Sequence, residues 1–265
     1  FPDELAAIAR SGVPTDSNGL LGRNQDWGGM YSPRFQLGAG RALRITLVME
    51  RFEDAGLAFQ AIRAGTDNIQ EDGHIPSSVP EEAFGGEQPR SHDVASAAAM
   101  FLGDACLGII ALETFPTPEE VATLEARQTV TDRLARATKW LLTEKEVLIE
   151  SDQNAPNRLF FDALAFQACG ILTSNKDSIE EAARFVDRGL AQYDSLGYFT
   201  EDGGWDTNYQ AVAIQVANDV LLAGYTDRDD VLQATLHQAA ICLAGRVDDE
   251  GVVDSSGNTR TCGGG

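Results

Sequence analysis

Two short segments of the sequence carry side chains that can exchange protons. In Asn208-Tyr209-Gln210 the phenol of Tyr209 lies one turn inside an expected helix start, where the partial positive charge of the helix end favours a phenolate. An ordinary tyrosine, with a pKa of about 10, is a poor base near pH 7, so this placement matters only if cationic groups converge on it. His92, in Arg90-Ser91-His92-Asp93, can act as a base or bind a carboxylate. Both residues also have ordinary interpretations, as a tyrosine at a helix entrance and a capping or surface histidine.

Carboxyl groups offer a second kind of chemistry. Two carboxyl groups on either side of a glycosidic bond, one protonated and one ionised, can hydrolyse that bond. The candidate pairs are Asp93 with Asp206 and Asp72 with Asp206. Because the chain has 41 acidic residues, two of them on suitable loops are easily found by chance.

Aromatic rings in Gly-rich segments could bind sugars. Trp27 and Tyr31, together with Trp205, are placed where an exposed ring could stack on a pyranose face. A core position is an equally open interpretation for Trp27. His74, in a turn bounded by proline, is a further candidate for substrate binding, with a structural role as the alternative.

The sequence predicts neither a metal site nor a cofactor. Its three histidines form no His-x-x-x-His pair and no Cys/His ligand set, so a zinc site is not expected. Asp202 with Asp206, or Asp249 with Asp254, could hold a hard cation, but the spacing does not match an EF-hand. Turn formation and helix capping explain these aspartates better.

The charge of the chain limits its partners. A formal net charge of -21 repels nucleic acid and anionic membranes, so neither is an expected partner. The same charge opposes a polyanionic substrate unless a local cluster of arginines reverses the potential inside a cleft. The sequence opens Phe-Pro-Asp without a charged-then-apolar leader, which suggests a processed start and an extracellular or periplasmic location.

The four cysteines form no Cys-x-x-Cys pair. Cys106, Cys169 and Cys242 lie in apolar helical segments, where buried free thiols are expected. Cys262 lies in a polar tail and could pair or react.

Helical periodicity dominates from residue 41 onward, and sustained strand alternation is absent, so we predict an all-α fold in one domain over residues 1–265. Ala182, Val186 and Leu190, at four-residue spacing, show the amphipathic pattern. Thr117-Pro118-Glu119-Glu120 and Ser178 with Glu181 resemble capping boxes at helix starts. The predicted helices are 41–64, 93–113, 118–127, 130–150, 157–173, 178–193, 207–224 and 228–245.

Three loops between the predicted helices repeat an acidic-Gly turn beside an apolar residue. They contain Glu71-Asp72-Gly73, Glu201-Asp202-Gly203 and Asp249-Glu250-Gly251. Local turn formation alone could account for them. Their recurrence favours equivalent loops along one rim of a helical array.

The alternation of helix, Asp-Gly loop and helix, with Gly204-Trp205-Asp206-Thr207-Asn208-Tyr209-Gln210 opening an inner helix, resembles the α/α-toroid polysaccharide lyases. The resemblance covers residues 38–260 through short, degenerate motifs. It implies an α/α toroid, an incomplete barrel of helical hairpins with short loop hairpins at one rim. The chain ends after a loop where such toroids continue with another helix, so a partial toroid, truncated at the C-terminus, is expected.

The resemblance also implies a mechanism. Similar lyases use Tyr, His, Asn and Arg, without an obligatory metal, to remove a proton next to a uronate carboxylate and to neutralise that carboxylate. The residues of matching type are Tyr209, His92, Asn208 and Arg260, with Trp27, Tyr31, Trp205, Gln210, Arg90, His74 and Asp206 as candidates for substrate binding.

The leading hypothesis is therefore β-elimination of a uronate-containing polysaccharide or oligosaccharide. A toroid-type glycoside hydrolase and a noncatalytic carbohydrate-binding domain remain as alternatives. All three require the loops that join the helices to face a shared groove.

Overall fold

The computed structural model describes residues 15–83 and 87–259. Within these residues the fold is built from α-helices, with two short 3-10 helices and no strand beyond isolated bridges, which confirms the all-α prediction. The elements are η1 (Gly22–Gln25), η2 (Pro33–Gln36), α2 (Ala39–Val48), α3 (Phe52–Thr66), α4 (Ser91–Thr114), α5 (Leu124–Thr143), α6 (Lys145–Asp152), α7 (Pro156–Thr173), α8 (Lys176–Leu190), α9 (Thr207–Leu222) and α10 (Asp229–Ala244).

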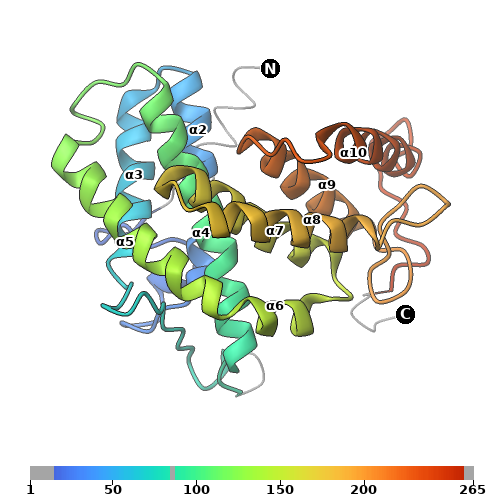
Figure 1. The fold of residues 1–265 in the computed structure, drawn as a ribbon, viewed down its shortest axis with the longest axis horizontal. Helices are drawn as coiled ribbons and strands as arrows, with labels where there is room; N and C mark the ends of the chain where they lie inside the picture. Colours follow the sequence, from blue (N-terminus) through green and yellow to red (C-terminus); the bar gives the residue numbers. More distant parts are fainter. Residues whose placement is uncertain (1–14, 84–86, 260–265) are drawn as a thin grey trace.

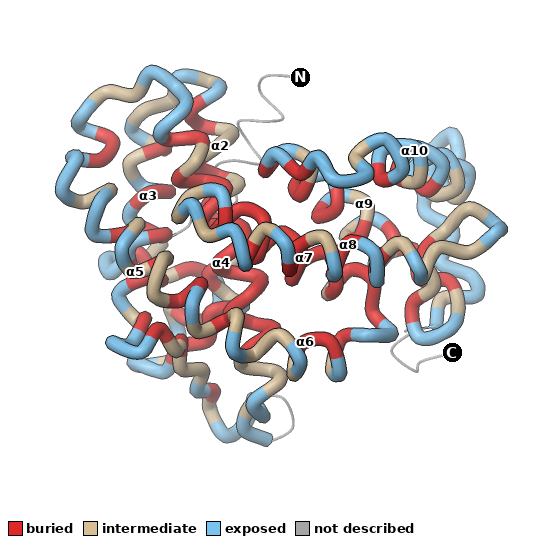
Figure 2. The backbone as a smooth tube through the Cα atoms, in the orientation of Figure 1, coloured by how far each residue is buried: buried red, intermediate tan, exposed pale blue. Residues whose placement is uncertain are grey.

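The helices form successive hairpins in two layers (Figure 1). The inner helices α2, α4, α7 and α9 pack side by side in that order. Of the outer helices, α3 covers α2, α8 covers α7, α10 covers α9, and α5 packs against both α4 and α7. Figure 2 shows α4 and α7 buried along most of their length, whereas α8 and α10 each keep an exposed face. The sequence explains the contrast, because α7 contains only two charged residues, Arg158 and Asp162, whereas α8 is strongly amphipathic.

Small residues let the inner helices approach one another closely. Gly103 of α4 lies against Ala165 of α7, and Gly108 lies against Gly40 of α2. A Cβ added at Gly40 would lie 1.8 Å from the carbonyl oxygen of Asp104, so a larger residue at this position would force the helices apart.

A disulfide between Cys106 and Cys169 joins α4 to α7. The buried free thiols predicted for these two residues are therefore wrong, and the reason is the tertiary contact of two helices that are distant in sequence. Cys106 lies 15 residues after the first residue of α4, and Cys169 lies 13 residues after the first residue of α7. The two helices consequently run parallel, and both begin at the same end of the array.

The loops at this end, which we call the rim, share one hairpin turn. In residues 69–75, 193–199 and 247–253, an N–H donates to the carbonyl four residues later: Gln70 to His74 at 2.9 Å, Asp194 to Tyr198 at 2.8 Å and Asp248 to Val252 at 3.0 Å. Each turn contains a glycine with positive φ, Gly73, Gly197 or Gly251. Residues 194–197 are thus the second member of the repeat, and Glu201–Gly203 forms a further turn in the same loop.

Several predicted helix boundaries are wrong for local reasons. The helix predicted over residues 41–64 is broken at Glu50, which has a φ of 55°, and forms α2 and α3. Thr117 bonds the carbonyl of Phe115 and starts no helix, because Thr123 caps α5 instead. The helices predicted over 118–127 and 130–150 are accordingly replaced by α5 and α6. Asn175 caps α8 by accepting the N–H of Ser178.

Among the described residues one helix, α4, is long and apolar enough to cross a membrane. In this fold 89% of its most apolar window is buried inside the protein. The helix is therefore the central core helix of the array.

Candidate functional site

A cleft of about 170 Å³ opens at the rim, beside the start of α4. We call it the rim cleft. The rim cleft is lined by Ser32, Arg34, Ser77, Val79, Glu87, Gln88, Pro89, Arg90, Asp93, Ser96, Ala97, Met100 and Arg158.

One face of α4 forms a wall of the rim cleft. Asp93, Ser96, Ala97 and Met100 follow the three-to-four-residue spacing that places side chains above one another on a helix. Asp93 also accepts the backbone N–H of Arg90 at 3.1 Å, which caps the helix. The small side chains of Ser96 and Ala97 leave room for a ligand, and the positive end of α4 points toward the opening.

The charge of the rim cleft has the opposite sign to that of the protein. Three lining residues are basic, Arg34, Arg90 and Arg158, and two are acidic, Glu87 and Asp93, so the lining carries a formal charge of +1. The whole chain carries -21. Arg34 is exposed and forms no ion pair with any other residue in the described part of the chain. The rim cleft therefore gathers three guanidinium groups, of which Arg90 pairs with Asp93, Arg158 pairs with Asp152, and Arg34 is left for an anionic ligand.

Arg158, in the first turn of α7, forms the floor of the rim cleft. Its side chain is 27% exposed, and it pairs with the buried carboxylate of Asp152 at 3.2 Å. Asp162, one turn further along α7, is also fully buried, and its pKa is raised well above the usual value by loss of solvent and by the adjacent Asp152. The partly exposed guanidinium of Arg158 thus lines the rim cleft, and the buried carboxyl groups of Asp152 and Asp162 lie behind it.

The expected proton-transfer residues lie at the starts of different inner helices. His92 lies beside Asp93 at the start of α4, with 3.5 Å between Nε2 and Oδ1. Asn208 and Tyr209 lie in the first turn of α9, and α7 packs between α4 and α9. Arg260 falls outside the described residues. Of the residues predicted to take part in chemistry or binding, only Arg90 and Asp93 line the rim cleft.

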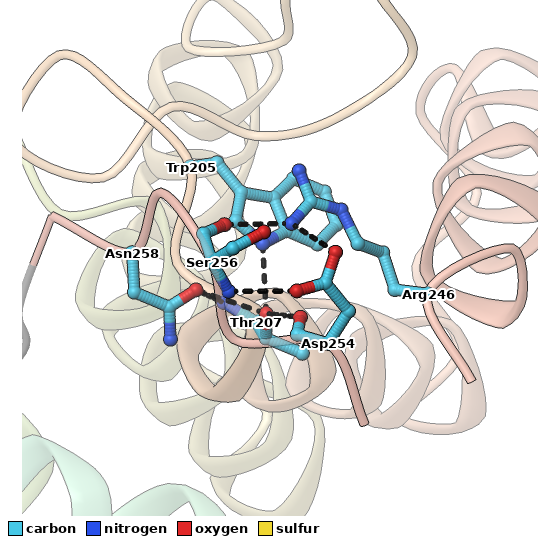
Figure 3. A network of polar contacts seen from close by, with 6 residues as sticks. All are labelled: Trp205, Thr207, Arg246, Asp254, Ser256 and Asn258. Carbon is cyan, nitrogen blue, oxygen red and sulfur yellow. Dashed lines mark hydrogen bonds and ion pairs between the residues drawn. The ribbon is translucent and has the colours of Figure 1, made fainter. Parts of the chain in front are cut away.

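Trp205 is covered by the loop that follows α10 (Figure 3). Its indole N–H donates to Thr207 Oγ1 at 2.7 Å, and the Arg246 guanidinium lies 4.5 Å from the centre of its ring. Asn258 holds Thr207 by bonds of 2.9 and 3.1 Å, and Arg246 pairs with Asp254 at 3.4 Å. Only 6% of Trp205 is exposed, so in this conformation the ring offers no face for sugar stacking.

Neighbouring residues of this segment also serve the fold. Gln210 is buried, and its amide bonds both the N–H and the carbonyl of Phe199. Asp206 is 2% exposed and caps α9 by accepting the N–H of Tyr209 at 3.0 Å. These contacts use the polar groups that were expected to bind substrate.

The remaining aromatic candidates are spread over the protein. Tyr31 is buried, and burial raises the pKa of its phenol. Trp27 is half-buried and packs edge-on against Phe35 at 5.0 Å, and His74 packs edge-on against Trp140 at 5.2 Å. None of the described residues that line the rim cleft is aromatic.

Sequence reasoning missed most of the cleft lining. The spacing from Asp93 to Met100 was a usable signal, as was Arg158, the sole basic residue in an otherwise apolar helix. Arg34 had no comparable signal, because it meets the other two arginines only through the tertiary fold.

Two solved structures share the arrangement of the helices. One is an unsaturated glucuronyl hydrolase, responsible for the degradation of glycosaminoglycan, from Bacillus sp. GL1, with a TM-score of 0.56 and 12% identity over 93% of this chain and 68% of that chain. The other is a variant of an unsaturated glucuronyl hydrolase with dGlcA-Glc-Rha-Glc, with a TM-score of 0.53 and 12% identity over 82% of this chain and 64% of that chain.

The fold is an α/α toroid. The predicted fold class is therefore confirmed. The solved structures that share it are hydrolases, whereas the sequence motifs resembled lyases. No protein-family model and no curated protein matches the sequence. At 12% identity the similarity establishes the toroid alone, and the chemistry has to be argued from the rim cleft.

Proposed function

We propose that this toroid binds the uronate end of a short oligosaccharide in the rim cleft and hydrolyses the terminal glycosidic bond. The observation that carries the proposal is the positive lining of the cleft, formed by Arg34, Arg90 and Arg158, in a protein of net charge -21. A carboxylate can form charge-assisted hydrogen bonds with these guanidinium groups, whereas the net charge of -21 repels it at long range.

The size and polarity of the rim cleft fit one sugar unit. Its volume of about 170 Å³ is below the roughly 300–1,000 Å³ of pockets that take drug-sized ligands. Ser32 and Ser77 supply hydroxyl groups for sugar hydroxyls, while Val79 and Met100 supply apolar surface. A terminal residue matches this volume better than several consecutive sugars do.

Two carboxyl groups of the lining, Asp93 and Glu87, are the proposed catalytic pair. Asp93 is held at the start of α4, where it accepts the backbone N–H of Arg90 and lies 3.6 Å from the Arg90 side chain. Hydrolysis needs one carboxyl group as the acid and one as the base or nucleophile, and Asp93 and Glu87 are assigned these two roles as a pair. Asp206, the partner considered from sequence, is 2% exposed and does not line the rim cleft.

The structural comparisons support hydrolysis over elimination. The similar toroids are unsaturated glucuronyl hydrolases, and one carries an oligosaccharide that ends in a dGlcA unit. The lyase hypothesis rests on Tyr209, His92 and Arg260, whose convergence no observation supports. We therefore assign an acidic oligosaccharide, including unsaturated uronyl oligosaccharides, as the substrate class.

Incubation with saturated and unsaturated uronyl oligosaccharides tests the proposal. We expect new reducing ends without formation of a new unsaturated chromophore in the ultraviolet. Asp93→Asn and Glu87→Gln should each lower turnover by at least about 100-fold. Glu119→Gln is the matched control, since Glu119 is exposed in the loop after α4, away from the rim. An increase in the chromophore on saturated substrates would show elimination and reject hydrolysis.

One observation favours a noncatalytic carbohydrate-binding role as the second candidate. Asp162, whose pKa is raised by burial and by the adjacent Asp152, is fully buried, as is Asp152, and neither carboxyl group can reach a glycosidic bond as it stands. Binding of the oligosaccharides without new reducing ends would favour this candidate. Arg34→Ala should weaken binding by about tenfold in either case.

We further propose an extracellular or periplasmic location. The Cys106–Cys169 disulfide supports it, because such bonds persist mainly in oxidising compartments. Localisation of the tagged protein in its host, by fractionation, tests this proposal, and recovery in the reducing cytosol would reject it.

A further inference from the structure

Behind the floor of the rim cleft lies a buried group of three charged side chains. Asp152, the last residue of α6, and Asp162 of α7 are both 0% exposed, and Arg158 lies between them and the cleft. Asp152 Oδ1 accepts hydrogen bonds from Arg158 at 3.2 Å and from the hydroxyl of Ser151 at 3.0 Å. One oxygen of Asp152 therefore accepts a hydrogen bond from Arg158 on the side of the guanidinium away from the rim cleft.

The other carboxylate oxygens of this group lack a donor. Asp152 Oδ2 and both oxygens of Asp162 are buried, and no N–H or O–H group of the described residues donates to them. Two ionised carboxylates cannot bond each other, because both are acceptors. A proton on Asp162 resolves this, since it makes the Asp162 carboxyl group a donor toward the adjacent Asp152.

The charge balance requires the same proton. With both aspartates ionised, the group carries one excess negative charge away from water, which costs several kcal/mol. With Asp162 neutral, Asp152 and Arg158 form a balanced pair. Asp152 from α6 and Arg158 from α7 are the charged groups that act on Asp162, and no described ionisable group of α4, α5, α8 or α9 adds to them.

We propose that Asp162 is a positioning residue, whose neutral carboxyl group donates to Asp152 and thereby fixes the guanidinium of Arg158 at the floor of the rim cleft. The effect on sugar binding rests on the proposed function. The positioning itself does not, and it can be measured without a ligand.

The side-chain Nε–H resonance of Arg158, assigned with Arg158→Lys, reports the position of the guanidinium in NMR spectra. Asp162→Asn keeps a donor toward Asp152, whereas Asp162→Leu keeps a similar volume and removes the donor. We expect the resonance to be retained in Asp162→Asn and to broaden or shift in Asp162→Leu. Circular dichroism and thermal unfolding verify that both variants fold. An unchanged resonance in folded Asp162→Leu would overturn the proposal.

Raising the pH supplies a test that needs no apolar variant. Loss of the Asp162 proton leaves two acceptors facing each other, so the Arg158 resonance of the wild-type protein should move in a step as the pH rises through the raised pKa of Asp162. That step should be missing in Asp162→Asn. The same step in both proteins would reject the shared proton.

Binding of glucuronate, measured by calorimetry, connects the positioning to the cleft. Asp162→Leu should bind about tenfold more weakly than the wild-type protein, and Asp162→Asn within about twofold of it. Equal affinities of the two variants would remove Asp162 from ligand binding. Absence of binding by the wild-type protein would reject the proposed function, and the NMR experiments would still decide the positioning.

Discussion

Removal of the Cys106–Cys169 disulfide tests how the parallel inner helices are held together. The bond joins residues separated by 63 positions. For a closed loop of that length, the chain-entropy relation gives about -14 cal/mol/K for the unfolded chain, or about 4 kcal/mol at 25 °C. Domains of this kind have free energies of unfolding of about 5–15 kcal/mol, so the predicted loss is a large part of the total.

The perturbation is the double variant Cys106→Ala/Cys169→Ala. Both sulfurs are buried, so a reductant reaches them only after unfolding, and substitution is the cleaner change. Urea unfolding followed by far-ultraviolet circular dichroism should show a free energy of unfolding about 4 kcal/mol below that of the wild-type protein. Cys242→Ala is the matched control because Cys242 is a free, half-buried cysteine, and it should change stability by less than about 1 kcal/mol.

Thiol titration checks the premise of the calculation. The chain has four cysteines, so the unfolded, unreduced wild-type protein should expose at most two reactive thiols, and the reduced protein four. A loss below about 1 kcal/mol in the double variant, with the bond present in the wild-type protein, would refute the entropic reasoning. Packing between α4 and α7 would then be sufficient to hold them.

Three further changes test the core and its buried charges. Asp104→Ala should lower the free energy of unfolding by about 3 kcal/mol, because the carboxylate accepts the N–H groups of Gly38, Gly40 and Arg41 at 2.7–2.9 Å; a loss below about 1 kcal/mol in urea unfolding would contradict this role. Gly40→Ala should lower the free energy of unfolding by about 3 kcal/mol. Gly56→Ala should leave it unchanged or raise it, because the nearest neighbouring atom would lie 4.0 Å from the added Cβ. Similar melting temperatures for the two variants would show that α2 can shift to accommodate the added methyl group. Because the pKa of Asp162 is raised in the folded protein, its contribution to stability is complete below the usual pKa near 3.8 and is lost as the pH rises through the folded-state pKa. The melting temperature of the wild-type protein should therefore fall over this pH range, and that of Asp162→Asn should not show this fall. Parallel profiles of melting temperature against pH for the two proteins would disprove the prediction.

The amino-acid sequence by itself determined the helices and the ends of many of them. Apolar periodicity predicted α7 and α9 to within two residues, because a helix that must bury one face shows it in local spacing. The rim turns at Gly73 and Gly251 were also readable, since a turn residue with positive φ is favourable for glycine, which has no Cβ. Asp93 could also be recognised from local sequence, because it is an acidic residue in the first turn of a predicted helix.

Only the tertiary structure decided which side chains meet. Arg34, Arg90 and Arg158 are far apart in the sequence and line one cleft because α4 and α7 run parallel from the same rim. Trp205 had the local features of an exposed platform, but the loop after α10 covers it with Arg246. Helix formation depends on neighbours within a few residues, whereas burial and charge at a site depend on contacts between segments whose distance along the chain leaves no periodic pattern.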